Sequence, residues 1–406
     1  MAKVALVLTR SPGPPMTGRK AVIRSTIAAL AAEGHAVDLI IVAKPDPAFR
    51  HDGRVTWLGT PRKADVLFNA ARAVLGGSSL NEALFQSRSL IGAMRPLYRA
   101  YDFAIADTIR VAPYAAALGV PWHLDMDDLF SARYERFAAA AGDVSADVVL
   151  GYYRDSAPGL ARAIPAALMR QVLLAEATRI KRREFYWARQ ASTVSLVSPE
   201  EAERFSRELG RPVLSLPMSV AAPATCWTPR QEAGAPVFVG PLDYKPNLDA
   251  LEYYQHEVFP ALQQAAAPSL LHHVGHAPER LRRLFDEQVV RFEGYVADLA
   301  ERLARAACFV APIVSGTGIK TKVLEAMATG VPVLATAEAI TGLQVRHGRD
   351  CLVCDHAGDF PLAMRALADP GFAAQLGRHA RRYVQENFSL DVLRRRWAGV
   401  VAELGR

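Results

Sequence analysis

The chain has 406 residues, about twice the length of a typical domain, so we expect two domains of roughly 200 residues each. Hydrophobic residues make up 51% of the sequence and charged residues 22%, a composition that excludes a disordered or fibrous protein. No apolar run approaches the roughly 18 residues of a membrane-spanning helix, and Val4–Leu8 is too short for a signal-peptide core. These features predict a soluble, cytoplasmic protein.

The formal net charge of +7 indicates an anionic partner. Nucleic acid is one interpretation, but no basic-aromatic recognition motif and no zinc-ligand set supports it, so we expect no nucleic-acid partner. Anionic diphosphate substrates or an anionic membrane surface account for the charge equally well. The four cysteines agree with a reducing compartment, and Cys351 and Cys354 have metal-like spacing without a second pair. We interpret Cys351–Cys354 as a buried strand.

The N-terminal part of the chain alternates between strand and helix patterns. The expected segments are a strand at 4–9, a Pro/Gly-rich loop at 11–18, a helix at 19–33 that stops at Gly34, and a strand at 35–42. This alternation predicts a doubly wound parallel sheet, in which ligands bind beyond the carboxyl ends of the strands. Gly18 and Arg19 are therefore expected at an active cleft.

The pattern continues through the first half of the chain. Strands are expected at 103–106, ending at Asp107, at 120–126, ending at Asp127 and Asp128, and at 193–197. Residues 136–190 are predicted to form a mostly helical insert. Ser198 is expected to cap a following helix in which Pro199 takes the first position.

The second half restarts the same rhythm after a Pro-rich linker. The expected organisation is a first domain over 1–216, a linker over 217–234, a second domain over 235–385 and a terminal helix over 386–406. Strands of the second domain are expected at 237–240, 270–274, 289–292, 308–312 and 331–335. Both halves are predicted to be α/β with Rossmann-like sheets.

The stretch from Ser315 to Thr336 carries the clearest chemical signal. A β-branched strand ends there, and Gly316 and Gly318 follow before a helix that carries Glu325. Glycines let a backbone approach a ligand closely, and the free amides of a helix N-terminus attract phosphate. Lys320 and Lys322 are unfavourable near a helix N-terminus unless an anion is bound, so both are expected to bind a diphosphate together with the amides of 316–319, which include Ile319. The alternative is that both lysines are solvated charges on the first turn of the helix.

This stretch resembles the donor site of the retaining, two-domain (GT-B) glycosyltransferases of the family-four type. Gly318, Glu325–Ala328, Gly330 and Pro332–Val333 match its pattern, whereas Thr317 stands where many members have a first Glu. Val239–Ala250 is similar to a form found in an exopolysaccharide- and exosortase-associated branch of sugar transferases. The resemblance implies a GT-B fold in which the C-terminal helix crosses back to the first domain.

The resemblance also implies roles for further residues of the second domain. Glu325 would accept hydrogen bonds from the ribose of the nucleotide, and Tyr295 and Val296 would lie beside the base. Lys245 stands near an expected phosphate-binding lysine, although Pro241 replaces the usual arginine before it. Thr317 has no charge, so the sugar cannot be inferred from members that have Glu. The alternatives are an exposed surface charge for Glu325, a loop-surface position for Lys245 and core packing for Tyr295.

In the first domain, Pro121–Phe130 resembles the strand that ends in His-Asp in the family. Asp128 matches the Asp and Asp127 takes the place of the His, so Asp127 is a candidate base or acceptor-binding carboxylate, flanked by Asp125. The alternative is that one carboxylate caps the next helix. His276 follows a second-domain strand and is either a ligand contact or a loop residue.

Two regions combine arginines with apolar residues at helical spacing. They lie over 72–99 and within the helical insert over 162–183. Basic amphipathic helices can lie on anionic membranes, but a core-facing stripe with a solvated basic face gives the same pattern. Association with the inner face of the plasma membrane is therefore one interpretation and ordinary packing is the other.

The leading hypothesis is a metal-independent, retaining transfer of a sugar from a nucleotide diphosphate sugar to a glycan or lipid-linked glycan. The alternatives are a non-catalytic binder of sugar nucleotides, favoured by Pro241 and Thr317, and a sugar-nucleotide epimerase of the same fold. A dehydrogenase is disfavoured because Gly316–Gly318 lacks the third glycine of the dinucleotide fingerprint.

Overall fold

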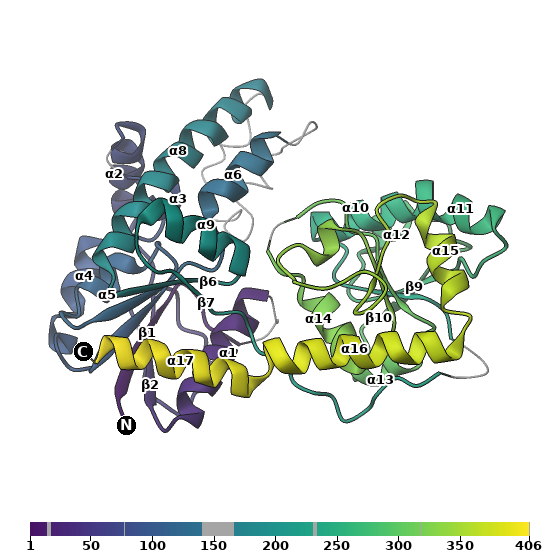
Figure 1. The fold of residues 1–406 in the computed structure, drawn as a ribbon. Helices are drawn as coiled ribbons and strands as arrows, with labels where there is room; N and C mark the ends of the chain where they lie inside the picture. Colours follow the sequence, from purple (N-terminus) through teal and green to yellow (C-terminus); the bar gives the residue numbers. More distant parts are fainter. Residues whose placement is uncertain (14–17, 77, 140–165, 230–233, 317, 406) are drawn as a thin grey trace. The chain divides into compact units, whose positions relative to one another are not determined.

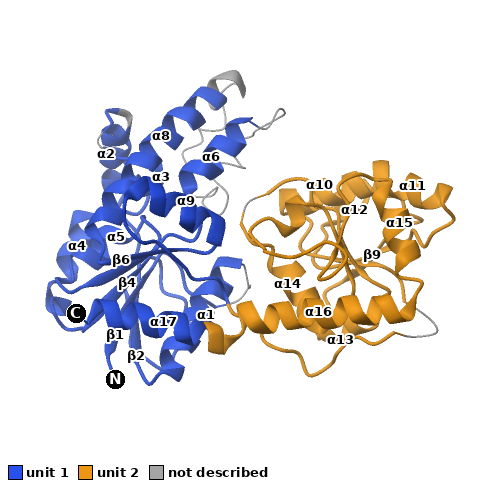
Figure 2. Ribbon diagram, in the orientation of Figure 1, with its two compact units in different colours: residues 1–218, 393–406 blue, residues 219–392 orange. Residues whose placement is uncertain are grey.

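A computed structural model describes residues 1–13, 18–76, 78–139, 166–229, 234–316 and 318–405. The chain forms two compact units (Figures 1 and 2). Unit 1 comprises Met1–Met218 together with Leu393–Arg406, and unit 2 comprises Ser219–Val392. Each unit is an α/β layer structure built on one parallel sheet.

The sheet of unit 1 has seven parallel strands in the order β3-β2-β1-β4-β5-β6-β7. They are β1 Lys3–Leu8, β2 Ala36–Ile41, β3 Val55–Trp57, β4 Phe103–Asp107, β5 Trp122–Asp125, β6 Thr193–Leu196 and β7 Leu214–Ser215. The central strands are fully buried because helices cover both faces, as parallel sheets require. The strand order reverses direction between β1 and β4, and such a switch point is where doubly wound sheets bind ligands.

Helices connect most of the strands of unit 1, and the following ones lie within its described residues. They are α1 Gly18–Ala32, α2 Lys63–Val74, α3 Leu80–Ala83, α4 Arg88–Ala93, the 3₁₀ turn η1 Arg95–Leu97, α5 Ala112–Ala116, α6 Phe130–Ala139, α8 Ala166–Gln190 and α9 Pro199–Leu209. Ser198 caps α9 by accepting from the Glu201 amide, with Pro199 at the first position, as the sequence predicts. Gly34 follows α1 with φ +80°, which explains why the helix stops there.

The C-terminal helix α17, Leu390–Leu404, packs on unit 1, which confirms the prediction of a returning helix. Leu393, Trp397 and Val400 are buried in one apolar cluster with residues of α1, β1 and β2. The Trp397 ring also meets His123 edge-on, with ring centroids 5.1 Å apart. Side-chain burial of this kind explains how the last residues of the chain belong to the first unit.

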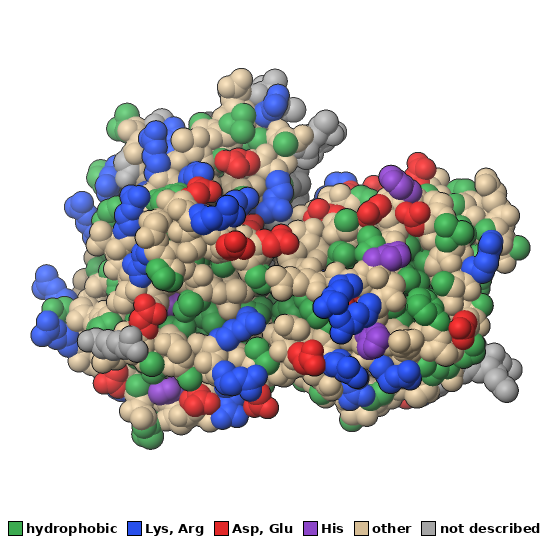
Figure 3. Space-filling view, viewed as in Figure 1, with side chains coloured by type: hydrophobic (Ala, Val, Ile, Leu, Met, Phe, Trp, Pro, Cys, Tyr) green, Lys and Arg blue, Asp and Glu red, His purple; other side chains and the backbone are tan. Residues whose placement is uncertain are grey.

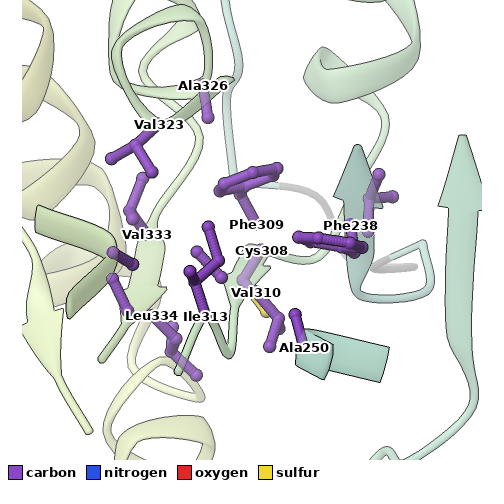
Figure 4. Packing of buried hydrophobic residues seen from close by; sticks show 14 of the residues in the cluster. Phe238, Ala250, Cys308, Phe309, Val310, Ile313, Val323, Ala326, Val333 and Leu334 are labelled. Atoms are coloured by element: carbon purple, nitrogen blue, oxygen red, sulfur yellow. The ribbon is translucent and has the colours of Figure 1, made fainter. Parts of the chain in front are cut away.

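The sheet of unit 2 has six parallel strands in the order β10-β9-β8-β11-β12-β13, with its switch point between β8 and β11. They are β8 Val237–Val239, β9 Leu271–Val274, β10 Val290–Gly294, β11 Phe309–Ala311, β12 Val333–Ala335 and β13 Leu352–Val353. Successive residues of β11 point to opposite faces: Phe309 lies on the side of Val323 and Ala326, and Val310 on the side of Ala250 (Figure 4).

The helices of unit 2 cover both faces of this sheet. They are α10 Lys245–Tyr253, the π-helical turn η4 Tyr254–Val258, α11 Phe259–Gln264, α12 Glu279–Arg282, α13 Leu299–Ala304, α14 Thr321–Thr329, the 3₁₀ turn η5 Glu338–Ile340, α15 Asp359–Ala366 and α16 Pro370–Phe388. The segment expected as a linker is tied to this unit at Trp227, whose indole Nε1 donates to the Ala306 carbonyl at 2.8 Å. Its backbone amide donates to the Thr329 carbonyl.

Most of the strands expected from apolar periodicity are present within one or two residues of their predicted ends. Cys351 and Cys354 flank the buried strand β13 as free thiols, so the strand interpretation is confirmed. The edge strands β3 and β7 of the first sheet were not predicted, since they have three and two residues and only half-buried side chains. Among the described helices, none has the length and apolar character that crossing a membrane would require.

Candidate active site

The switch point of the first sheet gathers three carboxylates around one arginine. Arg19, in the first turn of α1, lies beyond the carboxyl end of β1, and Asp107 and Asp125 are the last residues of β4 and β5. The guanidinium lies 2.5 Å from Asp107, 3.0 Å from Asp125 and 3.2 Å from Asp127. Three negative charges therefore face one positive charge at this edge of the sheet.

The excess of carboxylates shifts the pKa values of the residues in this cluster. Burial alone would lower the pKa of Arg19, but the charges of Asp107, Asp125 and Asp127 outweigh burial and hold its pKa well above the usual value. Burial raises the pKa of Asp127 to about 6, and the Asp128 carboxylate adds to this rise while Arg19 opposes it. Burial also raises the pKa of Asp125, and the Asp107 carboxylate adds to this rise while Arg19 opposes it.

Asp127 is the carboxylate of this set that is accessible from outside. Its side chain is 23% exposed, whereas those of Asp107 and Asp125 are almost fully buried. Its backbone has φ +65°, and Thr108, after β4, has φ +73°. Left-handed non-glycine residues are strained and concentrate at functional sites. Two hydrogen bonds stabilise this strained backbone of Asp127. The Val197 amide donates to the Asp127 carbonyl, and the Asp127 amide donates to the Asp125 carboxylate.

Asp128 and His123, which flank this cluster in the sequence, serve other purposes. Asp128 is buried and accepts hydrogen bonds from Nε and Nη2 of Arg133, at 3.0 Å and 2.5 Å. Because Arg133 belongs to α6, these bonds hold the start of that helix in place. His123 is fully buried and contacts the hydroxyls of Thr193 and Ser195 at 2.8 Å and 2.9 Å. Burial lowers the pKa of His123 to about 3, so it is a neutral core histidine.

The switch point of the second sheet brings two glycines and a lysine together. Gly240 follows β8 with φ +145°, and Gly275 follows β9 with φ +138°. A Cβ on Gly240 would lie 2.7 Å from the Lys322 Nζ and 2.6 Å from the Asn247 Nδ2, so only glycine leaves room for both side chains. The Lys322 ammonium donates to the Asn247 side-chain carbonyl, which holds it over this point.

Lys322 is half-buried, and burial lowers its pKa to about 7 although Glu325 raises it. Its Nζ lies 4.5 Å from the centroid of the Phe238 ring, a cation–π contact that further fixes its position. Asn247 is held in turn, because its Nδ2 donates to the Pro241 carbonyl at 2.6 Å. A lysine with such a low pKa gains its full charge when an anion binds next to it.

The glycine-rich turn after β11 leads directly into α14. Gly316 and Gly318 both have positive φ, +123° and +68°, so the turn needs glycine at these positions. No side chain caps the N-terminus of α14, where Lys320 is the capping residue. The first amides of this nine-residue helix are therefore presented to the same switch point as Lys322. Lys320 also donates to Glu338 at 3.0 Å.

The other candidate residues of the second unit lie around this turn in different settings. Glu325 is exposed on α14, and Tyr295 is 85% exposed beyond β10. Ile319 and Val296 are half-buried against the apolar core. Lys245 is exposed and pairs with Asp249 four residues later, and His276 is an exposed loop residue whose backbone carbonyl accepts from Leu242. Thr317 lies outside the described residues.

Sequence patterns did not assign a role to three residues that build these two groups. Asp107 was noted only as a strand end, yet it is the residue nearest to Arg19. Asn247 and Gly240 lie within the stretch Val239–Ala250, where their polar or small character was the only available signal. Over the residues that the structure describes, no group of three or more His, Cys, Asp or Glu side chains could hold a metal ion. The Arg19 guanidinium occupies the centre of the carboxylate cluster instead.

Comparison with known proteins shows which class of protein has a similar sequence and fold. Residues 235–369, which contain the second switch point, match the family model described as Glycosyl transferases group 1. Similar solved structures include a sucrose-phosphate synthase from Thermosynechococcus elongatus, with 20% identity, a TM-score of 0.66 and coverage of 100% of this chain and 99% of that one. No curated protein sequence matches the chain significantly.

Two further structures extend the same likeness over whole chains. HepE from Anabaena, solved with UDP and glucose, has 15% identity, a TM-score of 0.63 and coverage of 99% of this chain and 100% of that one. A point mutant of TarM from S. aureus, solved with UDP, Fondaparinux and α-GlcNAc-glycerol, has 8% identity, a TM-score of 0.64 and full coverage of both chains. The fold is therefore GT-B, as the sequence predicts. With a group 1 glycosyl transferase domain in its second unit, the protein is a glycosyltransferase.

Proposed function

We propose that the protein transfers a sugar from a nucleotide diphosphate sugar to a hydroxyl of a glycan or lipid-linked glycan acceptor, with retention of the anomeric configuration. The observation that carries the donor half is the Lys322 ammonium, fixed over Gly240 beside the uncapped N-terminus of α14. The solved structures with UDP support a uridine nucleotide as the first donor to test. Retention and the kind of acceptor rest on the resemblance to family-four enzymes and to the exopolysaccharide branch.

The donor half supplies stabilisation of the leaving group. As the bond between the anomeric carbon and the diphosphate oxygen breaks, negative charge grows on the diphosphate. The uncapped N-terminus of α14, with its dipole, and the charge of Lys322 offset that growing charge. Glu325, one turn further on, is exposed and able to accept hydrogen bonds from ribose hydroxyls. This chemistry needs no metal ion, and we propose that the reaction proceeds without one.

The acceptor half supplies a proton acceptor. An acceptor hydroxyl forms the new bond to the anomeric carbon and must lose its proton as it does so. Asp127 is exposed enough to receive that proton, and its pKa of about 6 suits a base that works near neutral pH. Arg19 holds the carboxylate in place while Asp107 and Asp125 keep Arg19 itself fixed.

The test is a binding screen by thermal shift and calorimetry with UDP, GDP, ADP, dTDP and their common sugars. We expect selective binding of one nucleotide class, with affinity reduced roughly tenfold or more in Lys322→Ala and Glu325→Ala. Arg305→Ala is the matched control, because that arginine is exposed and paired with Glu301 four residues earlier, and it belongs to neither group of site residues. Absence of nucleotide binding by well-folded wild-type protein would overturn the proposal and favour a non-catalytic assembly partner.

A further inference from the structure

The outer face of helix α2 is apolar although nothing covers it in the described structure. Leu67 is 66% exposed, Phe68 59% and Leu75, directly after the helix, 87%. These positions, with Ala64 and Ala71, follow the spacing of three and four residues that places side chains on one face of a helix. Apolar side chains this exposed are normal when scattered, but here they form one continuous stripe.

Contacts on the opposite face fix this orientation. The Asn69 side-chain amide donates to the Gln86 carbonyl at 2.7 Å, and Ala73 is fully buried. Asp65 accepts from the Ser87 hydroxyl at 2.8 Å, which ties α2 to the start of α4. The apolar stripe therefore cannot turn inward without loss of these contacts. In Figure 1, α2 lies at the outer edge of unit 1.

Positive charge borders the stripe and negative charge is absent from its exposed part. Arg62, Lys63 and Arg72 are exposed, and no ion pair engages them among the described residues. The one acid of α2 is Asp65, which is half-buried and bound to Ser87. A helix with exposed leucine and phenylalanine and only basic charge at its surface fits an anionic, partly apolar partner.

The chain segment around α2 is also rich in basic residues. Between residues 54 and 101 the chain has seven Lys or Arg residues and two acids, Asp65 and Glu82. Glu82 is fully buried and neutralised by Arg183 at 2.8 Å. Next to α2 in sequence, Arg88, Arg95 and Tyr98 line a shallow groove of about 600 Å³. The space-filling view shows Lys and Arg side chains along this edge of unit 1 (Figure 3).

We propose that the outer face of α2 docks on a lipid bilayer that contains anionic lipids. Leu67, Phe68 and Leu75 insert at the boundary between headgroups and acyl chains, and the basic side chains of the face contact the anionic headgroups. A second copy of the chain is a poorer occupant, because a symmetric α2–α2 contact would bring like charges together at Lys63 and Arg72. The proposal is independent of the identity of the sugar donor.

The experiment is co-sedimentation of the full chain with phosphatidylcholine vesicles, with and without phosphatidylglycerol. We expect binding to the anionic vesicles, a fall of roughly tenfold or more in Leu67→Ser/Phe68→Ser, and a fall of roughly fivefold per charge in Lys63→Gln/Arg72→Gln. The matched control is Leu284→Ser/Leu362→Ser, two leucines of unit 2 with 53% and 61% exposure, which should bind as the wild type does.

Two independent measurements separate the possible outcomes. Circular dichroism should give the same melting temperature for the α2 variants and the wild type, because the changed side chains are exposed. Size-exclusion chromatography with light scattering should give one mass at all concentrations. Equal vesicle binding by the α2 variants and the wild type, no preference for anionic vesicles, or a dimer that the α2 changes dissociate would each overturn the proposal.

Discussion

The Arg19 guanidinium lies 3.2 Å from the Asp127 carboxylate, so a residue after the first strand positions a carboxylate after the fifth. The two residues meet because β1, β4 and β5 are neighbours in the sheet and their carboxyl ends share one edge. With Asp107 and Asp125 also bound to Arg19, the local charge is two units negative. A carboxylate in such a setting is a poor contributor to stability and a good proton acceptor.

Asp127→Asn should abolish sugar transfer and at the same time stabilise the fold. The folded protein raises the Asp127 pKa from 3.8 to about 6, so its ionised form lowers stability progressively as pH rises through that interval. Asparagine carries no charge and tolerates positive φ. We expect about 1–2 kcal/mol of added stability above about pH 7, and no gain below about pH 4.

Chemical denaturation at both pH values and turnover of the identified donor measure these two effects. Asp127→Ala is the matched variant, since it also removes the charge but is strained at φ +65° and should gain less stability. Full transfer activity in Asp127→Asn would show that another group takes the proton.

Gly240→Ala should weaken nucleotide binding without unfolding unit 2. The new methyl would lie 2.7 Å from the Lys322 Nζ and would displace the ammonium from the switch point. We expect nucleotide affinity to fall roughly tenfold, and stability to fall by about 1–3 kcal/mol because φ is +145°. Calorimetry with the nucleotide that the wild type selects measures the first effect.

Gly399→Ala is the control for the glycine prediction. Gly399 lies within α17, where an added methyl meets no atom within 4 Å. Alanine there should stabilise the protein by roughly 0.5–1 kcal/mol and leave nucleotide affinity unchanged. Unchanged affinity in Gly240→Ala as well would show that the position of Lys322 does not matter for the donor.

Nucleotide binding should take up protons through Lys322. Its pKa of about 7 in the free protein rises when a diphosphate binds, so above about pH 7.5 the neutral amine of Lys322 takes up a proton on binding. We expect affinity to fall by up to tenfold per pH unit between about pH 7.5 and 9. Calorimetry in buffers of different ionisation enthalpy counts the protons. A pH dependence that persists in Lys322→Ala would assign it to another group.

Glu184→Gln should stabilise the first unit at neutral and higher pH. Glu184 of α8 is buried and accepts the Ser131 amide at 3.2 Å and the Ser131 hydroxyl at 2.5 Å. Burial raises its pKa from 4.5 to about 7, so its ionisation lowers stability as pH rises between these values. A glutamine side-chain oxygen can still accept the hydrogen bond from the Ser131 backbone amide. The Ser131 hydroxyl can rotate and accept a hydrogen bond from the glutamine NH2 group. We expect a gain of about 1–2 kcal/mol near pH 8 and little change near pH 4.5.

Thermal unfolding of both proteins at the two pH values is the measurement. Glu184→Ala should have the opposite effect on stability. It leaves the Ser131 amide in the first turn of α6 without a hydrogen-bond acceptor, so stability should fall by about 1–3 kcal/mol at both pH values. A Glu184→Gln variant less stable than the wild type near pH 8 would contradict the burial argument.

The sequence alone determined the alternation of strands and helices in both units. Apolar runs of strand length, Gly34 and the Ser198–Pro199 cap are local signals, and each is present in the structure at the expected place. The glycine-rich turn before α14 was equally visible, because only Gly316 and Gly318 adopt its positive φ values without strain. Periodicity and turn chemistry depend on neighbours in the chain, so one sequence is enough to detect them.

Only the tertiary structure decided which side chains meet. The sequence pattern of the insert left open whether its arginines face a membrane or form the solvated face of a packed helix. It did not show that α8 buries Glu176 and Glu184, which accept the backbone amides of Asn81 and Ser131. The clustering of Arg19 with three carboxylates was also absent from the sequence pattern. The spacing of Leu67, Phe68 and Leu75 shows one apolar helix face, but only the structure shows that this face points outward. Contacts between distant residues depend on strand order and on which helix face finds a partner, and neither is encoded by local periodicity.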